Sequence, residues 1–144
     1  MFRQMMFVIV AVLIFSVGYT NANAQRKLRV EVKEVVVKEA KNNSVTLDVT
    51  WSYIEQDNLL KPSEIMVIAV FVDSKGRERK ATNVIAVSHE ALPTSAKVVI
   101  NHEEQIVSPR DIKFVVTVAP KIKDGTSNTV AGRKEVTLRV NPTN

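Results

Sequence analysis

Apolar and polar residues alternate along most of this chain with a period of two. The clearest segment is SVTLDVTWSY, residues 44–53. Its apolar side chains occupy every second position: Val45, Leu47, Val49, Trp51 and Tyr53. Successive side chains of a β-strand point to opposite faces of a sheet, so this alternation predicts a strand with one face buried.

Six further segments show strand patterns, which makes seven predicted strands. They cover residues 28–37, 64–73, 77–87, 97–101, 111–120 and 134–140. The run Val35, Val36, Val37 breaks the alternation in the first strand and indicates either a β-bulge or a switch between sheets. Residues 64–73 are apolar at almost every position, which is typical of an internal strand covered on both sides.

Turn residues separate these strands. Asp73-Ser74-Lys75-Gly76 predicts a hairpin in which Gly76 can adopt a positive φ. No stretch after residue 24 has a convincing helical period. Seven short strands with regular turn signals predict an all-β, antiparallel sandwich built as a single domain over residues 25–144.

The N-terminus has a different pattern. Arg3 precedes an apolar run, residues 5–17, and Ala22-Asn23-Ala24 follows Gly18 as a small-x-small site. These three features are typical of a cleaved secretory signal peptide, residues 1–24. A retained membrane anchor is the competing interpretation, but spanning a bilayer takes about 20 apolar residues. We therefore expect export to the periplasm or the extracellular space, without stable membrane insertion after the signal is removed.

Charge and cysteine content narrow the possible functions. Removing the signal takes one of 20 basic residues and none of 15 acidic ones, so the net charge falls from +5 to +4. A mildly basic surface with interspersed charges favours acidic partners without forming a polybasic arm. The chain has no cysteine, which excludes disulfides, thiolate nucleophiles and cysteine-based zinc sites.

Two segments carry a resemblance to a known family. SVTLDVTW resembles the second strand of fibronectin type III domains, with Trp51 as the core tryptophan. IKFVVTVAP followed by KDGTSNTV resembles their sixth strand and the loop that leads to the last strand, with Gly125 and Ser127 at matching positions. The resemblance implies an immunoglobulin-like sandwich. The tyrosine usual near the start of the sixth strand is absent here, and Phe114 is the nearest aromatic residue.

Catalytic and metal-binding residues are scarce. The two histidines, His89 and His102, each lie beside a glutamate at a strand end, and we interpret both as solvent-exposed. A zinc site needs three or four convergent ligands. Ser88-His89-Glu90 cannot act as a triad, because triad members converge from separate elements. We expect no metal, no cofactor and no enzymatic activity.

The hairpin tip SKGRERK, residues 74–80, is the first candidate binding site. Its basic side chains are Lys75, Arg77, Arg79 and Lys80. They could dock on phosphate, sulfate or carboxylate groups of a surface polymer. The alternative is a solvated tip whose charges discourage edge-to-edge strand pairing. Nucleic acid is not expected as a partner, because no aromatic residues interleave these charges.

The loop over residues 120–132 is the second candidate. Its polar residues are Lys121, Lys123, Asp124 and Asn128. The corresponding loop of fibronectin type III domains often contacts partners, and binding residues commonly lie on loops of rigid scaffolds. A single acidic residue is too few for a calcium site.

Two functions stay open at this stage. The first is an exported, non-catalytic binding or scaffolding module of the cell envelope, with a protein or an anionic surface polymer as partner. The second is a small periplasmic immunoglobulin-like chaperone or assembly factor that suppresses aggregation, since residues 108–120 loosely resemble a strand of curli-assembly inhibitors.

Overall fold

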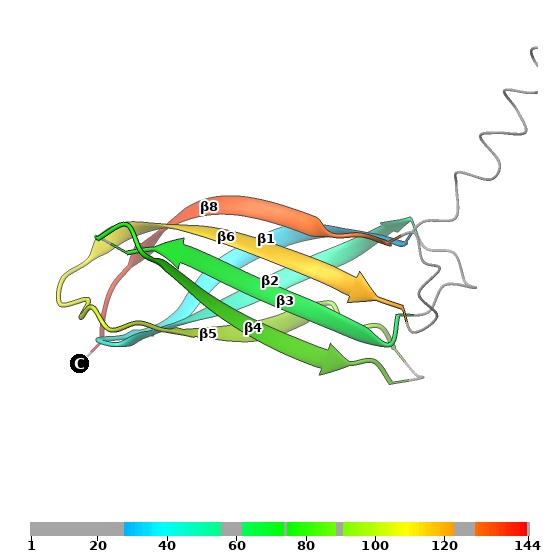
Figure 1. The fold of residues 1–144 in the computed structure, drawn as a ribbon, viewed down its shortest axis with the longest axis horizontal. Coiled ribbons are helices and arrows are strands. Elements are labelled where there is room, and N and C mark those ends of the chain that lie inside the picture. Colours follow the sequence, from blue (N-terminus) through cyan, green and yellow to red (C-terminus); the bar gives the residue numbers. More distant parts are fainter. Residues whose placement is uncertain (1–27, 56–61, 74, 89–90, 123–128, 144) are drawn as a thin grey trace, which may run out of the picture.

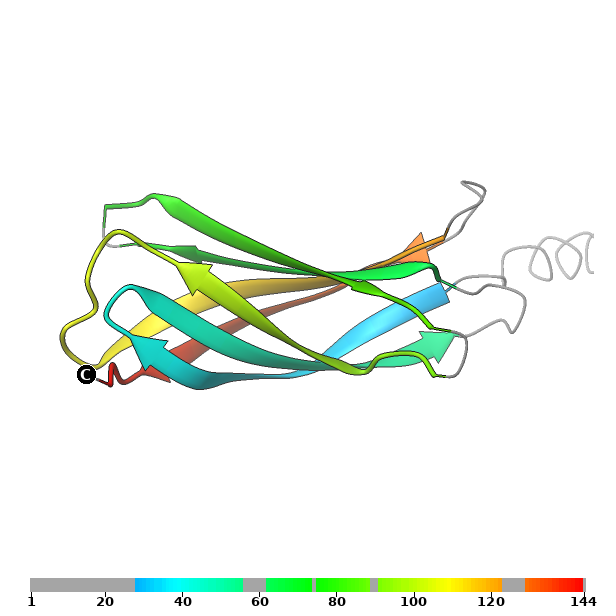
Figure 2. The same ribbon diagram turned by 90° about the horizontal axis from the view of Figure 1, so that it is seen from below.

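The chain folds as two stacked β-sheets of four strands each (Figures 1 and 2). The computed structural model describes residues 28–55, 62–73, 75–88, 91–122 and 129–143. No helix in these ranges is long and apolar enough to cross a membrane. The proposed signal peptide, residues 1–24, lies outside them.

The first sheet has the strand order β5-β2-β1-β7. Its strands are β5 (Ser95–Asn101), β2 (Ser44–Glu55), β1 (Leu28–Lys41) and β7 (Thr129–Val130). β2 pairs antiparallel with both β1 and β5, whereas β1 and β7 run parallel. This sheet forms the layer that contains the cyan strands in Figure 2.

The second sheet has the strand order β4-β3-β6-β8 and is antiparallel throughout. Its strands are β4 (Glu78–Ala86), β3 (Glu64–Val72), β6 (Arg110–Lys121) and β8 (Gly132–Val140). β3 and β6 are the two central strands. The outer face of this sheet points toward the viewer in Figure 1.

The all-β sandwich is confirmed, but the prediction of seven strands is wrong, because the described residues form eight. The additional strand is β7, which has only two residues and pairs with Leu28 and Arg29 at the start of β1. So short a strand cannot display a period of two. This pair is also parallel, which departs from the predicted antiparallel arrangement.

The core lies between the inner faces of the two sheets. Phe71 of β3 and Phe114 of β6 are both buried, and their ring centroids are 5.8 Å apart in an edge-on arrangement. Trp51, expected in the core, is 3 % exposed. Burial of apolar area at ~25 cal/mol per Å² is the main force holding such a domain together.

β1 stays in one sheet along its whole length. Its pairing with β2 slips between Val32 and Glu34, and again between Val37 and Glu39. Each slip inserts one extra residue and reverses the side-chain phase. The break in alternation is therefore caused by bulges, and the alternative of a switch between sheets is wrong.

β3 is an internal strand of its sheet, as predicted, and lies between β4 and β6. It is not covered on both sides. Ile65, Val67, Ala69 and Phe71 are buried against the other sheet, whereas the alternate residues are half-buried or exposed. Val72 is 53 % exposed. Its apolar outer face therefore has no cover from the described part of the chain.

Side chains tie the two sheets together along both open sides. Asn83 of β4 donates a hydrogen bond of 2.7 Å from Nδ2 to the carbonyl oxygen of Lys97 on β5. On the other side, Lys134 of β8 donates from Nζ to the carbonyl oxygen of Lys33, at 3.0 Å. Both carbonyls belong to strands of the first sheet. These bonds occupy acceptors that an extended chain could otherwise pair with.

Candidate functional site at the polar end of the sandwich

One end of the sandwich gathers several polar segments. The β3–β4 turn, the β5–β6 connection, the β1–β2 turn and the C-terminal residues all lie there, at the left of Figures 1 and 2. Backbone hydrogen bonds connect the last three of them. The amides of His102 and Ile106 donate to the carbonyl oxygens of Asn43 and Asn42, and Thr143 donates to Ala40. We call this region the polar end.

The β3–β4 turn has the geometry that its sequence predicts. Gly76 has a φ of 77°, a conformation that other residues adopt at a cost. Its amide donates to the carbonyl oxygen of Asp73 at 3.0 Å, and the Asp73 amide donates to the carbonyl oxygen of Arg77 at 2.9 Å. These two bonds close the hairpin and fix the direction of the basic tip.

The Asp73 carboxylate organises this turn from inside. Its side chain is 1 % exposed. Oδ1 accepts hydrogen bonds from the amides of Lys75 and Arg77, at 3.0 and 2.8 Å, and Oδ2 accepts one from Arg77 Nε at 3.0 Å. Burial raises the pKa of Asp73, but the hydrogen bonds and the charge of Arg77 outweigh burial and hold the pKa below its ordinary value.

Glu103, on the β5–β6 connection, binds both arginines of the tip. Its Oε2 lies 3.5 Å from Arg77 Nη1 and 3.2 Å from Arg79 Nη2. The Glu103 side chain is 77 % exposed. Because β4 and β5 belong to different sheets, these ion pairs link the two layers at the polar end. Exposed pairs contribute at most about 1 kcal/mol each, so their main effect is to position the arginines.

The four basic residues predicted at the tip therefore fall into two pairs. Arg77 and Arg79 are held by carboxylates, whereas Lys75 and Lys80 are exposed and form no ion pair within the described ranges. The tip thus carries two exposed ammonium groups beside two guanidinium groups of fixed orientation. Lys80 follows Arg79 on β4 and points to the opposite face of the sheet, so only a partner with several anionic groups could contact all four.

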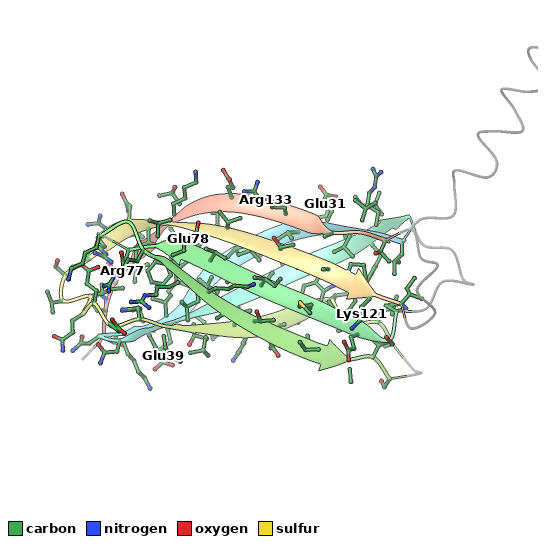
Figure 3. All side chains as sticks on the ribbon, in the orientation of Figure 1. Glu31, Glu39, Arg77, Glu78, Lys121 and Arg133 are labelled. Atoms are coloured by element: carbon green, nitrogen blue, oxygen red, sulfur yellow. The ribbon has the colours of Figure 1, made fainter. Side chains whose placement is uncertain are left out.

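The second predicted group lies far from the first. Lys121 ends β6 at the opposite end of the sandwich from Arg77 (Figure 3). Lys123, Asp124 and Asn128 lie outside the described residues. The structure therefore does not bring Lys121 together with the basic tip.

The expectation of an exposed His102 is wrong. The residue is 6 % exposed, and its ring meets Phe71 edge-on at a centroid distance of 5.6 Å. Nδ1 donates a hydrogen bond to the carbonyl oxygen of Glu104, and Nε2 is buried with no hydrogen-bond partner in the described structure. His89, the other histidine, lies outside the described residues.

Sequence reasoning missed that Asp73 and His102 are buried, although a signal was present. Asp73 continues the inward-facing series that ends in Ala69 and Phe71. His102 likewise continues the series that contains Ile100. A polar residue in phase with a buried apolar series faces the core. Glu103 had no such signal, because its partners are distant in sequence.

A shallow polar pocket opens elsewhere at the polar end. It has a volume of about 480 Å³, and the β1–β2 turn and the chain near Thr143 line it. Asn42 Oδ1 is buried here without a hydrogen-bond donor in the described residues. Over the same ranges, no three histidine, aspartate or glutamate side chains form a group that could hold a metal ion.

Comparison with known proteins identifies no family for this chain. The chain matches no protein-family model, and no curated protein is similar to it in sequence.

Proposed function

We propose that this chain is an exported, non-catalytic binding or scaffolding module that contacts an acidic partner through its polar end. The partner is a protein or an anionic surface polymer. Lys75, Arg77, Arg79 and Lys80 supply the contacts. The function therefore rests on surface chemistry, since a sandwich fold hosts many unrelated activities.

We further propose that the sandwich is of the immunoglobulin-like, fibronectin type III kind. The distribution of strands supports this assignment. β1, β2 and β5 share one sheet, while β3, β4, β6 and β8 share the other. The connections β2–β3, β4–β5 and β5–β6 thus cross between the sheets, as in Greek-key sandwiches. The buried Trp51 on β2 is also in keeping with that assignment.

The observation that carries the binding proposal is the fixed geometry of the tip. The buried Asp73 carboxylate holds Arg77 in place, and Glu103 binds both arginines from the side. Side chains that are already ordered lose little conformational entropy on binding. A carboxylate, sulfate or phosphate group can displace the exposed Glu103 and accept from the same guanidinium groups.

Retention on a polyanionic column, measured as the salt concentration of elution, tests this proposal. Lys75→Glu combined with Lys80→Glu should elute at lower salt than the wild type, because two cations become anions. Glu103→Gln should elute at higher salt, because it releases both arginines to an external anion. The loss of one acid raises the elution salt slightly at any position. A larger increase for Glu103→Gln is expected only if the binding site includes Arg77 and Arg79.

Two control variants separate a local site from overall charge. Lys33→Glu combined with Lys97→Glu makes the same charge change at exposed positions outside the polar end. Glu31→Gln removes one acid, as Glu103→Gln does, and releases Lys33 instead of the two arginines. If each control elutes with its matched tip variant, the polar end is not a binding site and the proposal fails.

A further inference from the structure

The outer face of the second sheet carries an apolar stripe along β3. Its outward-facing residues are Met66, Ile68, Val70 and Val72. The first three are half-buried, and Val72 is 53 % exposed. Large continuous apolar patches on a surface mark sites of interaction. Figure 3 views this face directly.

Neighbouring strands widen the stripe into a patch. Met66 lies between Val84 of β4 and Ala119 of β6 in the register of the sheet. Two residues further along, Ile68 lies between Thr82 and Thr117. Val84 is 49 % exposed. We call this surface, from Met66 to Val72 with its neighbours on β4 and β6, the β3 face.

Charged residues surround the β3 face. Glu78 and Lys80 lie on its β4 side, opposite Val72 and Val70 respectively. Lys113 of β6 and Glu135 of β8 lie on the other side, where their side chains form an ion pair of 3.4 Å. An apolar centre with a polar rim is the usual anatomy of a protein interface.

We propose that a second copy of this chain covers the β3 face, in a symmetric dimer whose two-fold axis runs parallel to β3. Such an axis places β3 of one copy over β3 of the other. It also places β4 of each copy over β6 of its partner. Two sheets pack face to face in this way about 10 Å apart and within about 30° of parallel.

The charged residues at the rim are the reason for proposing a second copy as the partner and an axis parallel to β3. Val72 pairs with Glu78 on β4, and the continued β3–β6 register places Lys113 on its other side. The two-fold rotation places the β4 side of each copy over the β6 side of the other. It therefore brings Glu78 of each copy to Lys113 of the other. By the same operation, Lys80 approaches Glu135 of the other copy. Both of these facing charge pairs are between opposite signs.

The apolar positions match under the same operation. Val84 of one copy meets Ala119 of the other, and Thr82 meets Thr117, while the β3 residues pack against their own equivalents. The nine residues of β3 span roughly 30 Å, and four strands span roughly 19 Å. The flat area, roughly 600 Å² per copy, is of the same order as the ~800 Å² of a stable interface.

Sedimentation equilibrium of the full-length chain, purified as the cell delivers it, tests the dimer. We expect the wild type to dimerise in the micromolar range. Ile68→Lys places a charge at the centre of the face and should raise the dissociation constant at least ~100-fold. Thr50→Lys, the matched control on the outer face of β2, should remain dimeric. Circular dichroism establishes that both variants stay folded.

A charge exchange tests the axis. Glu78→Lys alone and Lys113→Glu alone should each weaken the dimer, and the double variant should recover part of the loss. Since the chain has no cysteine, Ile68→Cys introduces a single thiol. A bismaleimide reagent of roughly 10 Å should join two copies there, and not at Thr50→Cys.

A wild type that sediments as a monomer at about 100 μM overturns the proposal, as does a Thr50→Lys variant that dissociates as readily as Ile68→Lys. A dimer without recovery in the double charge variant overturns the axis. Cross-linking of Ile68→Cys to a different protein in the cell envelope, with no homodimer, assigns the face to another partner. Each of these results is independent of polyanion binding at the polar end.

Discussion

The hydroxyl group of Tyr53 lies 2.6 Å from the carbonyl oxygen of Pro93 and donates a hydrogen bond to it. The same hydroxyl accepts a bond of 3.2 Å from Nε1 of Trp51. Burial raises the pKa of Tyr53, although the Trp51 bond acts in the opposite direction. The tyrosine thus fastens the segment before β5 to β2.

Tyr53→Phe should lower the free energy of unfolding by about 1–2 kcal/mol, because two hydrogen-bonding groups lose their partner. Urea unfolding followed by circular dichroism measures the change. Thr50→Val, which removes a hydroxyl with no comparable bond on the same strand, serves as the control. A loss equal to that of the control would show that the bond to Pro93 is not stabilising.

Trp51→Ala should cost about 3–5 kcal/mol, as truncation of a large buried aromatic residue does. The side chain is 3 % exposed, so its removal leaves a cavity between the sheets. Thermal unfolding monitored by circular dichroism is suitable, since the variant has no tryptophan. A loss below about 1 kcal/mol would contradict the core position.

Gly132→Ala should destabilise the domain more than Gly76→Ala. A Cβ atom at position 132 would lie 2.5 Å from the carbonyl oxygen of Val30, so the β1 backbone must move. At Gly76 nothing lies within 4 Å, and only the φ of +77° opposes the change. That backbone cost is about 1–2 kcal/mol. The urea midpoints of the two variants measure this difference. A larger loss of stability in Gly76→Ala than in Gly132→Ala would contradict the close approach of β8 to β1.

The stability of the domain should fall in acid partly through Asp73. Its pKa is lowered in the folded state, so its contribution is present above the ordinary value of 3.8 and is lost as pH falls through the folded pKa. Asp73→Asn keeps the acceptor for the Lys75 and Arg77 amides but cannot titrate. Urea midpoints between about pH 2 and pH 6 should therefore fall less steeply in this variant than in the wild type. Parallel curves would show that Asp73 is not involved.

The strand content of the fold was predictable from the sequence, because a period of two follows from strand geometry alone. β2 and β6 contain long alternating runs, and both lie where the alternation places them. β7 was not predictable, since two residues form no pattern and their pairing depends on the distant Leu28. The bulges of β1 were visible as a break, but only the pairing with β2 distinguished them from a change of sheet.

The candidate site was predictable in part. Four basic residues near a hairpin turn are visible in the sequence, and the turn itself follows from Asp73 and Gly76. Their arrangement was not, because Glu103 reaches Arg77 and Arg79 from the β5–β6 connection. An ion pair between residues so far apart in sequence depends on how the two sheets stack.

Alternation couples each side chain to one face of a strand, so the sandwich architecture and most core residues follow from the sequence. The stacking of the two sheets settles which apolar face of a strand is buried. The two sets of apolar residues on β3 look alike in sequence, yet Val67 and Phe71 meet the other sheet whereas Ile68 and Val72 face outward. Two stacked sheets have two inner faces and leave two outer ones, and the sequence of a strand that is apolar on both faces does not specify which face is inner.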